Sequence, residues 1–304
     1  MKKYFFILMA ALIACTVAIA QTSGSKRPKK KKQKTEKVVK KDHSKHNQSG
    51  KKPNPPKKQY SEEPRVSSSY TDDGIMFSIG NVRFEMVRVE GGTFTMGATE
   101  EQGSDADDSF EKPTHQVTLS SYMIGKTEVT QELWEVVMGS NPSHFKGSNL
   151  PVEQVYWEAC QAFITKLNAL TGKNFRLPTE AEWEFAARGG NKSRGYKYCG
   201  SNTLSNVAWY KDNSSSTTHP VASKAPNELG IYDMSGNVLE WCNDWFDIYY
   251  SLSEYNPTGP NSSRSSYRVG RGGCWCDYAW ACRVSRRTTA PTYLTGDLGL
   301  RLAL

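Results

Sequence analysis

The side chains best suited to ion chemistry lie within residues 227–245, NELGIYDMSGNVLEWCNDW. Asp233 and Glu240 can each offer a carboxylate oxygen. Gly236 between them lets the backbone turn tightly, so that the carbonyls of Gly236 and Val238 can face the same point. Oxygen ligands of this kind suit calcium. The stretch predicts a structural calcium site, and a tight turn between two core strands without an ion fits the same spacing.

Cysteine thiols are the second set of reactive groups. Once Cys15 is removed with a predicted signal peptide, six remain: Cys160, Cys199, Cys242, Cys274, Cys276 and Cys282. An even number of cysteines in an exported protein favours disulfides. Six cysteines allow fifteen pairings, so the sequence does not choose among them.

Helices that could position these groups occupy the middle of the chain. Thr130 caps a predicted helix over 131–138, and a second helix over 157–170 places Cys160 on its apolar face, where a buried, unreactive thiol is expected. A third helix is predicted within 176–190, where Thr179 and Glu182 have the spacing of a capping box.

The rest of the domain has the pattern of short strands and loops. Apolar residues alternate near 75–79 and 87–89, further strands are expected at 94–96 and from residue 117, and 99–111 is predicted to be an exposed acidic loop. Gly, Ser, Asn and Pro dominate beyond residue 190. The fold class expected is α+β, with few short helices, small antiparallel sheets and much irregular loop.

The first 66 residues differ in composition from the remainder. Residues 1–20 have the layout of a signal peptide and are too short in their apolar run to span a membrane, while a lipobox-like stretch offers lipidation at Cys15 as an alternative. Residues 21–66 form a Lys/Pro-rich tail expected to be disordered, and 67–304 a single domain. We expect an exported, periplasmic or secreted protein of a Gram-negative bacterium.

The tail explains the positive charge of the chain. It carries fifteen Lys or Arg against two acidic residues between 26 and 58, so the net +8 of the chain leaves −7 for the rest once Lys2 and Lys3 are also set aside. Such a tail could touch an anionic envelope surface, and a solvated spacer has the same composition. No motif for specific nucleic-acid recognition is present in the sequence.

Several motifs, in order, resemble the formylglycine-generating enzyme family, also called sulfatase-modifying factors: 89–97, 126–130, 176–190, 227–245, 271–275 and 298–301. The resemblance implies a fold related to C-type lectins, with little regular secondary structure and bound calcium. Asp233, Gly236, Val238 and Glu240 fall on the family's calcium motif. Asn206 and Val207 match the beginning of a second calcium site, whose later positions are occupied here by Asn213 and Ser215.

The family's oxidases convert a sulfatase cysteine to formylglycine with O2 and a copper ion held by two thiolates spaced Cys-x-x-x-x-Cys. Cu(I) prefers such soft ligands. In this chain Cys276 and Cys282 have five residues between them, and Cys274 replaces a family Ser. One inserted residue moves a thiolate by about 3.3 Å. A copper-dependent oxidase with a sulfatase client is therefore the alternative, and copper is expected only in that case.

The favoured function is a non-catalytic binding or envelope-associated module that uses residues 274–297 against a protein or glycan ligand. Some proteins with the family's fold are hypermutated ligand binders in this stretch, although ordinary drift of a surface loop also accounts for its residues. The predicted ligand surface comprises large amphipathic side chains, which recur at recognition surfaces: Trp275, Tyr278, Trp280, Arg283, Arg286 and Tyr293.

Overall fold

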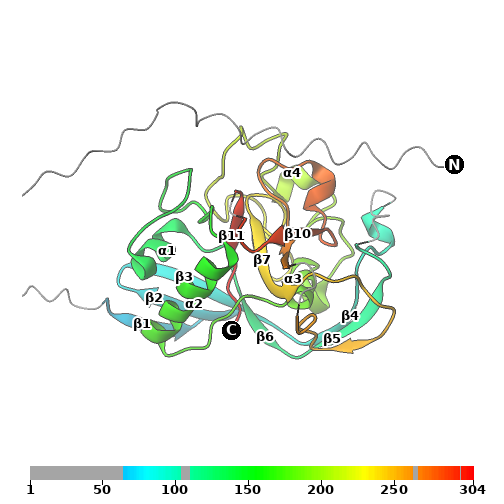
Figure 1. The fold of residues 1–304 in the computed structure, drawn as a ribbon, viewed down its shortest axis with the longest axis horizontal. Coiled ribbons are helices and arrows are strands. Elements are labelled where there is room, and N and C mark those ends of the chain that lie inside the picture. The colour runs from blue at the N-terminus through cyan, green and yellow to red at the C-terminus, as the bar shows by residue number, and fades with distance from the viewer. Residues whose placement is uncertain (1–63, 104–109, 263–265, 295) are drawn as a thin grey trace, which may run out of the picture. The chain divides into compact units, whose positions relative to one another are not determined.

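The computed structural model describes residues 64–103, 110–262, 266–294 and 296–304 (Figure 1). The predicted signal peptide, Cys15 and the basic tail up to residue 63 lie outside these residues. Within them, no helix is both long and apolar enough to cross a bilayer. The fold is α+β with small sheets and much loop, as the sequence predicts.

The first sheet begins at Val66, the last residue assigned to the tail from the sequence. Its four strands are antiparallel, in the order β1-β2-β3-β6. Alternation works as predicted in β2, where Phe77 and Ile79 are buried in the core. The strands are β1 (Val66–Tyr70), β2 (Gly74–Ile79), β3 (Val82–Val89) and β6 (Tyr122–Gly125).

Two further sheets carry the later part of the chain. One has the order β10-β9-β7-β11, with β11 parallel to β7, and the other has the order β4-β5-β8. The strands are β4 (Gly92–Met96), β5 (His115–Leu119), β7 (Leu239–Trp245), β8 (Glu254–Tyr255), β9 (Tyr267–Arg271), β10 (Arg287–Pro291) and β11 (Leu298–Leu300).

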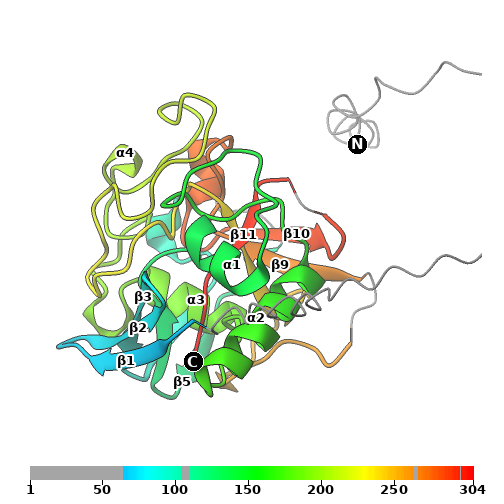
Figure 2. The same ribbon diagram turned by 90° about the vertical axis from the view of Figure 1, so that its left-hand side faces the viewer.

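Helices α1 (Gln131–Met138) and α2 (Trp157–Thr171) pack together and against the first sheet (Figure 2). Thr130 caps α1 through the N–H of Leu133, and both helices end at a glycine in the left-handed conformation, Gly139 and Gly172. These starts and ends agree with the prediction. A fourth helix, α4 (Leu204–Val207), was not predicted.

Helix α3 (Glu180–Ala187) lies within the predicted stretch 176–190 and ends at Arg188 as its C-cap. Before the helix begins, Arg176 pairs in extended conformation with Ala303. The predicted capping box of Thr179 and Glu182 is present. All eight residues of α3 are buried, with Trp183 and Phe185 in the same core cluster as Val117 and Val269. The helix is therefore an internal element between the β4 and β7 sheets.

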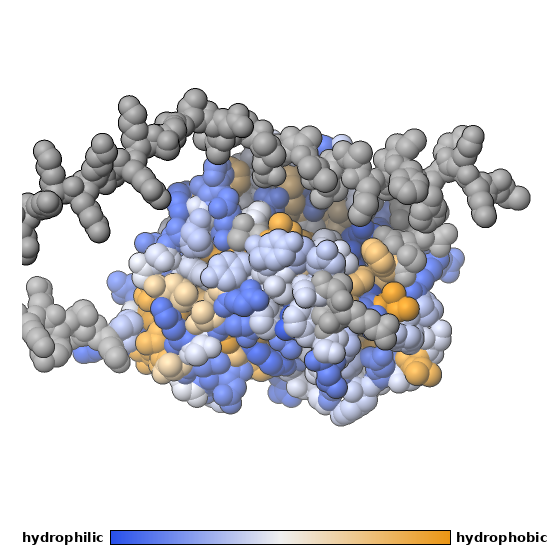
Figure 3. All heavy atoms as spheres, viewed as in Figure 1, coloured by the Kyte–Doolittle hydropathy of each residue, from blue (hydrophilic) through white to orange (hydrophobic). Residues whose placement is uncertain are grey.

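The prediction of an exposed loop over 99–111 is wrong for part of it. Gln102 and Glu111 are fully buried, although residues 104–109 lie outside the described part of the chain. Glu111 is an ion-pair partner of Arg283, which explains why a carboxylate is held inside. On the face seen in Figure 3, hydrophobic patches are small and separated by hydrophilic residues.

Candidate functional site

The C-terminal loop turns sharply at two glycines after β9. Gly272 and Gly273 have φ angles of 97° and 71°, a region that favours glycine. A Cβ atom on Gly273 would lie 2.9 Å from the carbonyl oxygen of Ala281 and 3.0 Å from Sγ of Cys282. The loop thus folds back so that its first residues lie directly on a short 3-10 helix, Ala279–Cys282.

Cys282 is fully buried at the end of this 3-10 helix. It belongs to a small apolar cluster with Tyr198, Leu204, Val207 and Ala208. Burial raises the pKa of its thiol, so the thiol stays protonated at neutral pH. Cys282 is therefore placed as a core residue.

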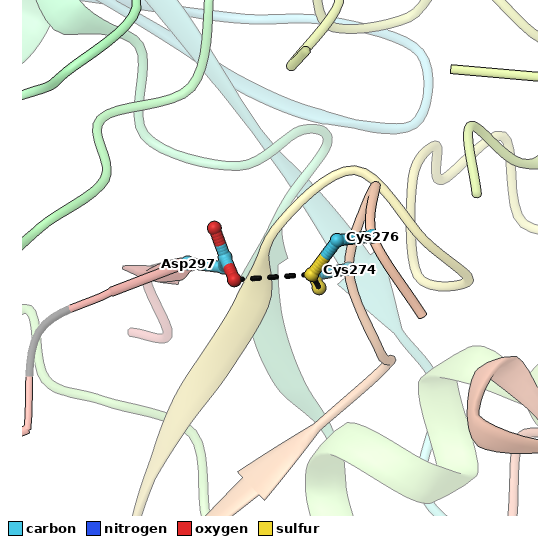
Figure 4. Close-up of side chains that lie close together, drawn as sticks. All are labelled: Cys274, Cys276 and Asp297. Atoms are coloured by element: carbon cyan, nitrogen blue, oxygen red, sulfur yellow. Dashed lines mark hydrogen bonds between the residues drawn. The ribbon is translucent and has the colours of Figure 1, made fainter. Parts of the chain in front are cut away.

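Cys276 has different neighbours. Its Sγ lies 2.8 Å from Sγ of Cys274 and 3.1 Å from Oδ2 of Asp297, and the three side chains converge in Figure 4. Among the residues that the structure describes, this is the group in which three potential metal-ligand atoms of His, Cys, Asp or Glu all lie within 4.8 Å of one another. The sequence prediction named Cys276 and Cys282, and it missed Asp297.

Three of the predicted surface residues are exposed. The exposed fractions are 54% for Tyr278, 46% for Trp280 and 80% for Tyr293. Lys211 places its Nζ 3.8 Å from the ring centroid of Tyr278, and the guanidinium carbon of Arg286 lies 4.9 Å from that of Trp280. These cation–π contacts orient two of the rings at the surface.

The prediction of Arg283 as a surface residue is wrong. Its guanidinium is fully buried and donates to both oxygens of Glu111, at 2.7 and 2.8 Å. Trp275 is only partly exposed, because its ring packs edge-on against Phe145 at 5.4 Å. The exposed part of the loop is therefore narrower than the sequence predicts, centred on Tyr278, Trp280 and Tyr293.

The predicted calcium ligands have hydrogen-bond partners within the protein. Both oxygens of Glu240 are occupied, by Nε and Nη2 of Arg301 and by Nε1 of Trp183, at 2.7 to 3.1 Å. Three N–H donors contact this carboxylate, because the single hydrogen on Nε of Arg301 is shared between both oxygens. Calcium at these residues stays a prediction from the sequence, and the contacts of Glu240 do not support it.

The other members of that motif have structural roles here. Oδ2 of Asp233 accepts the N–H of Ala222 at 2.7 Å, and burial raises the pKa of Asp233 to about 6. Gly236 has a φ of 80°, and a Cβ there would lie 2.2 Å from the carbonyl oxygen of Trp209. Val238 is fully buried, and its N–H donates to Glu128 at 3.0 Å.

The second predicted calcium position lies in and after α4. The Asn206 carbonyl accepts the N–H of Ala225, and Val207 is buried in the cluster of Cys282. Asn213, at a later position of that motif, uses its amide within the loop: Oδ1 accepts from Tyr210 and Nδ2 donates to Ala208. These contacts are made within the protein, and calcium at this position stays a prediction from the sequence.

A buried ionic cluster beneath α3 was missed by the sequence reasoning. Arg287 donates to both oxygens of Glu180, at 2.6 and 2.7 Å, and Arg271 pairs with Glu180 and Glu184. The carboxylate of Asp244 accepts the N–H of Glu180 at 3.0 Å. The cluster borders a cavity of about 330 Å³. The cluster joins α3 to β7, β9 and β10. The acidic residues of the α3 motif were the feature of the sequence from which this cluster could have been predicted.

Comparison with known proteins agrees with this architecture. Residues 80–304 match the model of the sulfatase-modifying factor enzyme 1-like domain. This chain belongs to the sulfatase-modifying-factor family. Among solved structures, Treponema denticola variable protein 1 is 37% identical, with a TM-score of 0.68 over 77% of this chain and 99% of that one.

Family members of several kinds are similar to the chain. A Paenibacillus barcinonensis protein named chaperone protein LppX is 36% identical over 66% of this chain and 82% of its own length. The formylglycine-generating enzyme of Streptomyces coelicolor is 30% identical over 71% of this chain and 88% of its own length. The chain spans only 38% of the length of Chlamydia pneumoniae serine/threonine-protein kinase pkn1. Family membership therefore does not select one activity.

Proposed function

We propose that this family member is an exported binding module without the family's cysteine-oxidising activity, and that its ligand surface is formed by Tyr278, Trp280 and Tyr293. The observation that carries the proposal is the position of Cys282. Its sulfur is enclosed in an apolar cluster, while Cys276 contacts Cys274 and Asp297. Among the described residues, Cys276 groups with Cys274 and Asp297, all within 4.8 Å of one another, and Cys282 is not part of that group, so the arrangement does not favour a copper site built from Cys276 and Cys282.

The exposed rings suit a protein ligand. Tyr and Trp provide large contact areas at a small cost in side-chain entropy, and both are enriched where binding energy concentrates. Lys211, beside the ring of Tyr278, can pair with an acidic group of a ligand. The chain is similar over 99% of the length of a protein named Treponema denticola variable protein 1, and a fold that accepts variation would suit a ligand surface.

The location of the protein is part of the proposal. Residues 1–20 support export, and the basic tail would approach anionic groups of the envelope. The lipoprotein alternative at Cys15 predicts a membrane-bound form, and mass spectrometry of the mature N-terminus distinguishes it from cleavage after Ala20.

A displayed peptide library, selected on the full chain, tests the surface. Selected peptides are expected to lose at least tenfold in affinity for a Tyr278→Ala/Trp280→Ala/Tyr293→Ala variant. Tyr70→Ala is the matched control, because Tyr70 is 88% exposed but lies on β1. Peptides that bind the triple variant as tightly as the parent chain contradict the proposed surface.

A second assay tests the absence of the family's oxidase activity. Full chain loaded with copper(I) is incubated in air with a peptide that carries a sulfatase-type cysteine sequence. No loss of the peptide's thiol to an aldehyde is expected by mass spectrometry. Conversion that disappears in Cys276→Ala and Cys282→Ala would establish the oxidase instead.

A further inference from the structure

We propose that Cys274 and Cys276 form a reversible thiol–disulfide redox pair, in which Cys276 attacks a substrate disulfide, Asp297 accepts its proton and Cys274 resolves the mixed disulfide. The pair is independent of the ligand surface proposed above.

The distances favour bond formation over metal binding. The two sulfurs are 2.8 Å apart. A disulfide bond is about 2.05 Å long, so the sulfurs need to approach by less than about 1 Å to bond. Two thiolates bound to one zinc ion, each at about 2.3 Å in tetrahedral geometry, are separated by about 3.8 Å. The sulfurs are thus too close to share such an ion without moving apart.

The two thiols differ in exposure in the manner that an exchange reaction requires. Cys276 is partly exposed and can meet a substrate, whereas Cys274 is 4% exposed. The hydrogen bond to Cys276, together with burial, raises the pKa of Cys274. Cys274 therefore stays a thiol until Cys276 has formed a mixed disulfide with the substrate.

The backbone holds this pair in place. The N–H of Cys274 donates to the carboxylate of Asp277 at 3.0 Å, and the N–H of Trp275 donates to the carbonyl of Asn237 at 2.8 Å. Asp297 comes from the far end of the loop, where its carbonyl accepts the N–H of Leu239 at 3.0 Å. The carboxylate is therefore fixed beside Sγ of Cys276 by the β7–β11 pairing (Figure 4).

The reaction balances with a disulfide as the co-reactant. The Cys276 thiol transfers its proton to Asp297, and the thiolate attacks one sulfur of the substrate disulfide. The substrate S–S bond breaks, a mixed disulfide forms, and the leaving thiolate takes the proton from Asp297. Asp297 then takes the proton of the Cys274 thiol, and the Cys274 thiolate attacks the Cys276 sulfur. The mixed disulfide breaks, and the second half of the substrate leaves as a thiolate that takes the proton from Asp297. Two thiols of the chain are oxidised while one substrate disulfide is reduced to two thiols.

Glutathione disulfide serves as the probe for the reduced full chain. After acid quenching and alkylation, the parent chain is expected to contain an internal disulfide between Cys274 and Cys276, and Cys282→Ala is expected to form the same bond. Cys274→Ser should stop at a glutathione adduct on Cys276. Cys276→Ser should acquire no adduct on Cys274, because that thiol is buried.

Asp297→Asn tests the role of the carboxylate separately from the bond. We expect the oxidation rate near neutral pH to fall at least about tenfold, with the same final extent of oxidation, since the loss of a positioned base slows proton transfer. Raising the pH should restore the rate, which a purely structural role would not produce. A disulfide that includes Cys282, or two glutathione adducts on the parent chain, would overturn the redox pair.

Discussion

Glu240 and Arg301 form an ion pair with both side chains fully buried, in which Oε1 of Glu240 lies 2.7 Å from Nη2 of Arg301. Nη1 and Nη2 of Arg301 also donate to the carbonyls of Gly125 and Tyr232, at 2.9 and 2.8 Å. The pair therefore connects β7 and the C-terminus to the end of β6. It supplies a positive charge at the position for which the sequence suggested calcium.

Arg301→Met should destabilise the fold by about 3–5 kcal/mol, because it leaves the carboxylate of Glu240 buried without its charged partner. Urea unfolding measures the loss. Lys126→Met is the control, since Lys126 pairs with Glu85 but its side chain is 38% exposed, and we expect a change below about 1 kcal/mol. Equal losses in both variants would show that the buried pair has no special role.

Removal of calcium should leave the stability unchanged. An ion that binds only the folded state raises the unfolding midpoint in proportion to the logarithm of its concentration. Because the oxygens of Glu240 are occupied by Arg301 and Trp183, we expect the same thermal midpoint in a strong chelator and in millimolar calcium. A higher midpoint in calcium would restore the ion site predicted from the sequence.

Asp244 should make the fold less stable as the pH rises. Burial, followed by the charge of Glu180, raises the pKa of Asp244 from 3.8 to about 8 in the folded chain. The folded state thus keeps a proton that the unfolded state releases, so this contribution is fully present below pH 3.8 and is lost as the pH rises to about 8. The loss should be at least about 1 kcal/mol.

Asp244→Asn checks this dependence, because its amide oxygen can still accept the N–H of Glu180. Urea unfolding at a series of pH values should show a smaller decrease for the variant than for the parent chain. Asp212→Asn, at an exposed position, should follow the parent. Parallel curves for the parent chain and Asp244→Asn would exclude Asp244 as the titrating group.

The local elements could be predicted from the sequence because their signals are local. The capping box at Thr179, the terminal glycines of α1 and α2, and the alternation in β2 each depend on residues a few positions apart. Burial of charge could not be predicted this way. Glu111 is held by Arg283, 172 residues away, so its acidic surroundings suggested an exposed loop. Asp297 likewise meets Cys276 only through the β7–β11 pairing.

The cap of α3 should contribute to stability in a measurable way. Thr179→Ala removes the oxygen that accepts the N–H of Glu182, at 3.2 Å, and should cost about 0.5–2 kcal/mol in urea unfolding. Thr203→Ala is the matched control, because Thr203 precedes α4 without a side-chain cap. We expect little change there, and a similar loss at both threonines would remove the capping explanation.

The order of thiol alkylation should follow burial. Among the cysteines that the structure describes, we expect Cys276 to react first with iodoacetamide in the reduced, folded chain. Cys276 is partly exposed, whereas Cys160, Cys199, Cys242 and Cys282 are buried. Burial also raises the pKa of Cys199 to about 12, so its thiolate is scarce. Peptide mass spectrometry after brief labelling measures the order, and Cys276→Ser should remove the fast phase. Early labelling of Cys282 would mean that its apolar cluster opens in solution. That result would remove the main argument against a copper site with two thiolates.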